Sequence, residues 1–226
     1  MKKIGLLLLV IVLFFSGCKK DAPIQESFDF GYGFFPLNIG DSSFFLVEQT
    51  TWNDFDNTID TITYSLCEYI ESMTVNYTGD SLYRIERLKK YDNDPTWNLD
   101  SVWFALKTKN EAIRVEQNIS YVKMVFPVSL NSLWNGNIHN TLGSKTYTFS
   151  NLSSNVVVNN ISYNRTVNIQ QENFVTLINS DVENEIYADG VGLVKTEKTH
   201  VYKTYNPASG EFEIKSGYIF SQKRVQ

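Results

Sequence analysis

Several stretches of this 226-residue chain alternate between apolar and polar side chains with a period of two. Side chains alternate across a β-strand, so this pattern is typical of a strand with one buried face. The pattern covers four stretches: 81–88, with Tyr83 and Ile85 on one face; 101–107, with Val102, Phe104 and Leu106 on one face; 112–116, with Ile113 and Val115 expected inward; and 211–215, with Phe212 and Ile214 on one face.

Turn-forming residues separate these stretches, at 78–80, 92–95, 108–110, 135–137 and 207–210. Short strands joined by such turns favour antiparallel hairpins. We therefore predict an all-β domain, a large and mainly antiparallel sheet that runs as a meander. A short helix could form only at 129–134 or 181–185, because the remaining stretches lack a period of 3.6 residues.

The N-terminal pattern is different. Lys2 and Lys3 precede an apolar run, residues 4–15, and Ser16-Gly17-Cys18 follows it. This is the layout of a secretory signal peptide over residues 1–17. Twelve helical residues rise about 18 Å, less than the roughly 30 Å of a bilayer core. A transmembrane anchor or a buried N-terminal helix is the alternative.

The order Phe15-Ser16-Gly17-Cys18 resembles a lipobox, the processing site of bacterial lipoproteins. The resemblance implies that Cys18 becomes the first residue and carries acyl chains, such as palmitate, that anchor the protein in a membrane. Residues 18–27 would be a short tether and residues 28–226 a single β-rich domain. We expect a lipid-anchored protein of the cell envelope, at the outer membrane, with its periplasmic or surface face left open.

Charge and composition argue against one class of partner and favour one type of secondary structure. The chain has 20 basic and 25 acidic side chains, and removal of Lys2 and Lys3 with the signal peptide would leave 18 against 25, a net charge of −7. An acidic chain without a basic cluster argues against nucleic acid as a partner. The 15 Phe, 13 Tyr and 4 Trp favour strands over helices.

The second cysteine, Cys67, has no partner if Cys18 is lipidated. It lies in a strand-like run, and the simplest interpretation is a small buried hydrophobic residue. The alternative is a reactive thiol, which usually needs a cation or a histidine nearby.

Three segments resemble those of an uncharacterised family of Bacteroidota envelope lipoproteins. They are Phe35-Pro-Leu-Asn-Ile-Gly-Asp-Ser-Ser-Phe, Tyr187-Ala-Asp-Gly-Val-Gly-Leu-Val-Lys, and the stretch 121–137. The resemblance implies a half-open β-barrel, similar to lipoprotein carriers, with a concave apolar face; a β-sandwich is the alternative fold. Gly190 and Gly192 suit a tight turn, and Trp134 is expected to be a buried anchor rather than a ligand-stacking residue.

Three Asp-Ser/Thr-hydrophobic triplets resemble acceptors for O-glycosylation in exported Bacteroidota proteins. Their acceptors would be Thr61, Ser81 and Ser101. Each triplet also fits an Asp that begins a strand after a turn.

The sequence offers no motif that carries catalysis. His139 and His200 are the only histidines and lie far apart, which argues against an ordinary zinc site. The pairs Glu68/Glu71 and Glu183/Glu185 could in principle serve a glycosidase, but we interpret them as charges on the outward faces of strands. The polar run 53–57 is expected to be a hairpin tip rather than a calcium loop. We therefore expect no catalytic residues, no metal and no cofactor.

The leading hypothesis is a non-enzymatic binding module, anchored to the membrane through Cys18, for an apolar or amphipathic ligand or for an envelope protein. A structural or adhesion lipoprotein is the alternative, and a hydrolase is a weaker one. Complete filling of the sheet by its own side chains would exclude the ligand hypothesis.

Overall fold

The computed structural model describes residues 28–225, which form one short 3-10 helix, η1 (Tyr32–Phe34), and twelve strands. The first half of the chain forms six strands joined by hairpin turns. They are β1 (Ser42–Asn53), β2 (Thr58–Val75), β3 (Ser81–Lys90), β4 (Asn98–Lys107), β5 (Glu111–Glu116) and β6 (Ile119–Val125). None of the helical residues described forms a segment long and apolar enough to span a bilayer.

The second half of the chain forms another six strands. They are β7 (Leu133–Asn135), β8 (Thr146–Val158), β9 (Ile161–Val175), β10 (Asn179–Ala188), β11 (Gly192–Asn206) and β12 (Glu211–Arg224). Each half is a meander in which consecutive strands pair antiparallel. Residues 181–185 are therefore strand, and 129–134 are turn and the start of β7, so neither of the two suggested helices forms.

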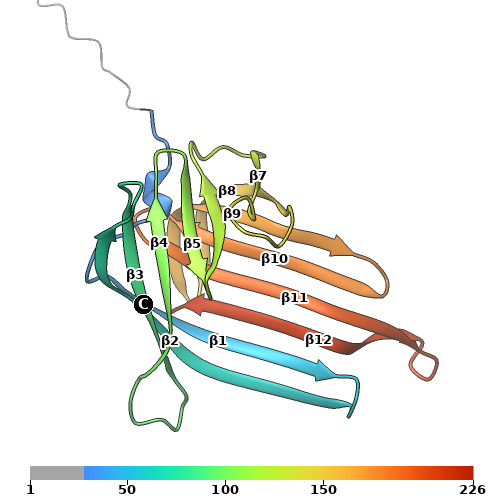
Figure 1. Cartoon of the computed structure of the whole chain (residues 1–226). Coiled ribbons are helices and arrows are strands. Elements are labelled where there is room, and N and C mark those ends of the chain that lie inside the picture. Colours follow the sequence, from blue (N-terminus) through green and yellow to red (C-terminus); the bar gives the residue numbers. More distant parts are fainter. Residues whose placement is uncertain (1–27, 226) are drawn as a thin grey trace, which may run out of the picture.

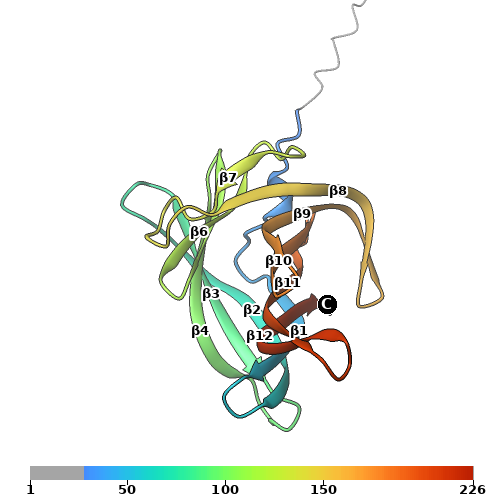
Figure 2. The ribbon, with the colours of Figure 1, turned by 90° about the vertical axis from the view of Figure 1, so that its right-hand side faces the viewer.

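The two halves join through β1 and β12, so the sheet order is β6-β5-β4-β3-β2-β1-β12-β11-β10-β9-β8-β7. The β1–β12 ladder is antiparallel and runs from Phe45 opposite Arg224 to Trp52 opposite Gly217. All twelve strands belong to one sheet, which confirms the antiparallel half-open barrel and excludes a sandwich of two sheets. Figure 2 shows the sheet curling into a ring.

The ring has one unsealed seam, between β6 and β7, which are neighbours along the chain. Here the Val122 N–H donates to the Gly136 carbonyl at 2.8 Å, and the Trp134 indole N–H donates to the Val122 carbonyl at 2.8 Å. The Trp134 ring lies 4.6 Å from that of Phe149, centroid to centroid. Trp134 is therefore an anchor packed against the core, as predicted, and it helps to close the seam.

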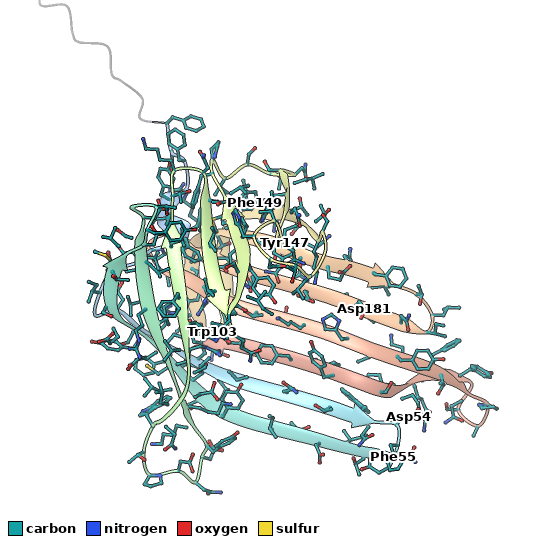
Figure 3. All side chains as sticks on the ribbon, in the orientation of Figure 1. Asp54, Phe55, Trp103, Tyr147, Phe149 and Asp181 are labelled. Atoms are coloured by element: carbon teal, nitrogen blue, oxygen red, sulfur yellow. The ribbon has the colours of Figure 1, made fainter. Side chains whose placement is uncertain are left out.

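The strands differ greatly in length. β2 has 18 residues and β11 has 15, whereas β5 has 6. As a result, β1, β2, β11 and β12 extend well beyond the shorter strands β3–β6 (Figure 1). The turn between β1 and β2 lies at the far end of this extension, where Figure 3 places Asp54 and Phe55. The polar run 53–57 is thus the hairpin tip that was predicted.

The segment before β1 packs into the ring. Gly31 has φ +81°, and a Cβ there would lie 2.6 Å from Val128, so glycine is required at the start of η1. Phe34 and Phe35 follow and are buried with Met124, Phe149 and Tyr187 in the main apolar core. The Gly190 N–H donates to the Gly33 carbonyl at 2.8 Å. The Phe35 and Tyr187 ring centroids lie 6.1 Å apart, so two of the signature segments, far apart in sequence, meet in space.

The predicted faces of two strands need correction. Ala105 of β4 and Arg114 of β5 both line an interior cavity. Because side chains alternate across a strand, Val102, Phe104 and Leu106 share the outer face, and Ile113 and Val115 also point outward. The expectation that Ile113 and Val115 point inward was wrong in orientation, although Ile113 is buried, at 7% exposed. By contrast, Ile85 lies on the inner face and is 5% exposed, as predicted.

Candidate functional site

The interior of the barrel contains a layer of paired charges instead of a continuous apolar face. We call Glu68, Arg87, Arg114, Glu116, Lys123 and Glu185 the inner charged layer; they come from strands β2, β3, β5, β6 and β10. In its first part, Glu68 Oε1 lies 3.0 Å from Arg87 Nε, and Glu68 Oε2 lies 2.5 Å from Arg114 Nη2. The expectation of an apolar concave face was therefore wrong for this layer.

The second part of the inner charged layer centres on Lys123. Its Nζ lies 2.9 Å from Glu116 Oε1 and 2.9 Å from Glu185 Oε1. The Tyr187 hydroxyl donates to Glu185 Oε2 at 2.7 Å. Lys123 is only 4% exposed and Glu185 only 4%. These charges persist in the interior because each has partners of opposite sign.

Burial and pairing act on these groups in opposite directions. Burial alone raises the pKa of Glu68, but the guanidinium groups of Arg114 and Arg87 outweigh it and hold that pKa below its usual value. Burial likewise lowers the pKa of Lys123, whereas the carboxylates of Glu116 and Glu185 bring it well above the usual value. Glu68 and Lys123 are therefore ionised near neutral pH.

A cavity of about 320 Å³ lies between this layer and the N-terminal segment. We call it the amphipathic cavity. Its apolar wall consists of Phe35, Pro36, Leu37, Phe45, Ile70, Ile85, Ala105, Val191 and Leu193. Its polar lining includes Asp41, Ser43, Glu68, Arg114 and Arg224. The volume is at the lower end of the range for small-molecule sites, and the side chains of the barrel do not fill it. The condition that would have excluded a ligand is not met.

Arg224 also lines this cavity, and its hydrogen-bond partners are neutral groups. Its Nη1 donates to Ser43 Oγ at 2.9 Å and to the Val191 carbonyl at 3.3 Å. Within residues 28–225, no carboxylate oxygen lies within the 4.0 Å of an ion pair with Arg224. Burial lowers the pKa of this guanidinium. The carboxylates of Asp41 and Glu68, which line the same cavity, act on it only from beyond ion-pair distance. A half-buried guanidinium without an ion-pair partner within 4.0 Å can bind an anionic group.

A second interior space of about 190 Å³ continues from the amphipathic cavity, sharing Glu68, Arg114 and Leu193. Aromatic rings of Tyr64, Trp103 and Phe220 line it. The Arg87 guanidinium stacks 3.6 Å above the Trp103 ring centroid, which Figure 3 places on β4 inside the curve of the sheet. In this space, aromatic rings therefore lie next to paired charged side chains, an arrangement suited to binding a small molecule.

The candidate catalytic groups each contact a charged side chain of the sheet. His139 Nε2 lies 2.8 Å from Glu111, and His200 lies between Asp181 at 3.0 Å and Glu183 at 2.9 Å. Glu71 pairs with Arg84 at 3.0 Å. Among the described residues, no group of three or more His, Cys, Asp or Glu side chains is arranged to hold a metal ion.

Cys67 is a small buried hydrophobic residue, as the simpler interpretation predicted. It is 7% exposed in β2. Burial, with a contribution from the Glu68 carboxylate, raises the pKa of its thiol. A thiol with a raised pKa holds little of the reactive thiolate at neutral pH.

The predicted modification sites differ in their surroundings. Cys18, the signal peptide and the tether lie outside the described residues. Thr61 is exposed on β2, where its hydroxyl lies 3.0 Å from that of Thr50. Ser81 begins β3 and is half-buried. Ser101 is half-buried on β4, and pairs with Arg87 of the inner charged layer. Of the three, Thr61 is therefore the acceptor that an enzyme could reach most readily.

Sequence reasoning missed the inner charged layer. The signal was present, because Arg114 and Glu116 alternate with Ile113 and Val115, but the apolar set was assigned to the inside. Alternation divides the side chains of a strand between two faces, but it does not show which face lies inside the barrel. Only the pairing of Arg114 with Glu68, distant in sequence, resolves the choice.

Comparisons with known proteins add little to this site. No protein-family model matches the chain, and no curated protein matches it. Among solved structures, the crystal structure of a candidate lipoprotein from Parabacteroides distasonis ATCC 8503 covers 89% of this chain and 99% of its own, with 9% sequence identity and a TM-score of 0.29. The likeness is weak, so the site has to be interpreted from its own residues.

Proposed function

We propose that this protein is a lipid-anchored, non-enzymatic binding protein of the bacterial envelope, whose barrel takes up a small amphipathic ligand. The anchor is argued from the sequence, where the apolar run 4–15 ends at Cys18. The single observation that carries the binding role is the amphipathic cavity, which has an apolar wall and a charged lining.

The cavity favours a ligand with two kinds of surface. Contact with Phe45, Ile85 and Leu193 would remove apolar ligand surface from water, at roughly 25 cal/mol per Å². Arg224 would hold the polar end, because its guanidinium has neutral partners within the barrel. We therefore propose a ligand with an apolar body and an anionic head group.

The test is mass spectrometry on protein purified from its native membrane, with analysis of the N-terminal peptide and of an organic extract. An acylated Cys18 with a stoichiometric amphipathic compound in the extract is the expected result. In Arg224→Gln the compound should be depleted, whereas Lys223→Gln, the adjacent residue on the opposite face of β12, should retain it. An empty extract from the wild-type protein would contradict the ligand proposal.

A second candidate is a scaffold that binds an envelope protein through its hairpin tips. The observation that favours it is the exposure of large apolar residues there: Phe55 is 97% exposed in the β1–β2 turn and Leu177 74% in the β9–β10 turn. Apolar side chains gathered at one end of a molecule often mark a contact surface. Crosslinking in membranes from Phe55, with Phe55→Ser as the comparison for partner capture, distinguishes this role from ligand uptake.

A further inference from the structure

Four aromatic rings form a ladder at the point where the described chain begins. The Phe30 ring centroid lies 4.9 Å from that of Phe28 and 5.5 Å from that of Tyr32. The Tyr32 centroid lies 4.7 Å from that of Phe126. Phe126 is 8% exposed, whereas Phe30 is 41% and Phe28 is 68% exposed. The ladder therefore leads outward from the apolar core and holds two phenyl rings at the surface.

Hydrogen bonds attach the ladder to two connections of the sheet. The N–H of Val128, between β6 and β7, donates to the Phe30 carbonyl at 3.0 Å. The Tyr32 hydroxyl donates to the carbonyl of Lys109, in the β4–β5 turn, at 2.9 Å. Figure 1 shows this turn at the top of the view, close to where the described chain begins. The two exposed rings are thus part of the folded domain.

Other apolar side chains are exposed at the same end of the sheet. The strand register places the β2–β3 turn there, because Leu82, just after that turn, pairs with Leu106, just before the β4–β5 turn. Tyr77 in the β2–β3 turn is 100% exposed, and Leu130 in the β6–β7 connection is 48% exposed. Exposed apolar side chains gathered in one region often mark a contact surface. We call the following residues the N-terminal apolar surface: Phe28, Phe30, Tyr77 and Leu130.

The chain before Phe28 indicates what covers this surface. Only residues 18–27 separate Phe28 from the proposed anchor at Cys18, and even fully extended they span at most about 36 Å. The exposed Phe55 lies beyond the far end of β1, a strand of 12 residues that alone rises about 40 Å. Of these two apolar ends, the short tether therefore favours the N-terminal apolar surface as the one that meets the bilayer.

The charge of this surface indicates how it would bind. The segments that form it are 28–31, 76–80, 108–110 and 126–132, and they contain one basic side chain, Lys109, against Asp29 and Asp80. Asp29 is paired with Arg165 of β9. Without a basic cluster, attraction to anionic lipids cannot supply the binding. Burial of the apolar side chains at the boundary between head groups and acyl chains can supply it.

We propose that the N-terminal apolar surface docks on the bilayer in which Cys18 is anchored. This inference rests on the acylation of Cys18 in the proposed function. The acyl chains would hold the protein at the membrane, and the docked surface would fix its orientation. The tips of the β1–β2 and β11–β12 hairpins would then lie on the side away from the bilayer (Figure 1).

Quenching by brominated lipids tests the orientation of the full, acylated protein. Mass spectrometry first verifies the acylated N-terminal peptide, and the protein is then reconstituted in vesicles of brominated phosphatidylcholine. A fluorophore is attached to Lys109→Cys in one sample and to Phe55→Cys in another, while Cys67 is buried, at 7% exposed. The label at position 109 should be quenched at least about twofold more strongly than the label at position 55.

A matched pair of variants tests the residues of the surface. Phe28→Ser combined with Phe30→Ser should remove about half or more of the quenching at position 109, while the protein still floats with the vesicles. Phe55→Ser, which removes an exposed ring at the far tip, should leave that quenching unchanged. Circular dichroism verifies that each variant keeps the fold.

The outcomes separate docking from anchoring. Flotation with equal quenching at positions 109 and 55, or with undiminished quenching after removal of Phe28 and Phe30, would overturn the docking alone. An unmodified Cys18 and a protein that does not float would overturn the anchor of the proposed function, and the docking with it.

Discussion

At the scale of single residues, the notable feature is that the barrel keeps charge where a core would normally be apolar. Glu68 and Lys123 each have two partners of opposite sign within 3.0 Å. Paired charges tolerate burial because their mutual attraction offsets the loss of hydration. The same pairing makes each member sensitive, since the removal of one leaves another buried and unpaired.

Lys123→Met should therefore be strongly destabilising. It leaves Glu116 and Glu185 without their ammonium partner in the interior, and we expect the free energy of unfolding to fall by about 3–5 kcal/mol. Urea denaturation followed by tryptophan fluorescence measures this loss. The control is Lys195→Met, whose partner Glu197 is 49% exposed; it should change stability by less than about 1 kcal/mol. Similar values for the two variants would contradict a structural role for the buried pairs.

The carboxylates of the layer also predict how stability depends on pH. The pKa values of Glu68 and Glu116 are lowered in the folded state. Their contribution is therefore complete above the unfolded-state value, about 4.3, and is lost as pH falls through the folded-state value. Urea midpoints should be constant from pH 7 to about pH 5 and then drop. Glu68→Gln should flatten this acid limb, and Glu197→Gln on the outer face should keep it.

At the scale of elements, local sequence determines where strands begin and bend. The turn between β10 and β11 needs Gly190 at φ +72° and Gly192 at φ +86°, and the latter faces Pro36 of the N-terminal segment. The turn and that segment therefore fit closely, and a side chain at position 192 would press against Pro36. This contact links the two signature segments and forms one wall of the amphipathic cavity.

Gly192→Ala should be more damaging than Gly210→Ala. Both positions have a left-handed backbone, at φ +86° and +77°, so each substitution costs about 1–2 kcal/mol from the backbone alone. A Cβ at position 192 would also lie 3.3 Å from Pro36, whereas one at position 210 meets nothing within 4 Å. The difference between the two melting temperatures reports the Pro36 contact. Equal losses would show that the N-terminal segment yields without cost.

At the scale of the whole molecule, the sequence predicted the type of sheet better than its interior. Strands 81–90 and 111–116 follow from alternation and turns, which are local properties. The meander also follows from short connections. The closure of β1 on β12 could not be predicted, because nothing local in 42–53 indicates a partner at 211–224. For the same reason the cavities, to which both halves contribute, were not predictable residue by residue.

The position of the seam has a consequence for the continuity of the chain. Ser129 and Leu130, in the exposed connection from β6 to β7, link strands that do not form a ladder with each other. Cleavage there would interrupt no strand pairing and would leave two complementary six-stranded fragments.

We expect fragments 28–129 and 130–225, when co-expressed, to reassemble through the β1–β12 ladder and to co-purify through a tag on either one. Deletion of β12 from the second fragment should abolish their association. The barrel thus consists of two six-stranded half-sheets, which a single exposed linker connects along the chain.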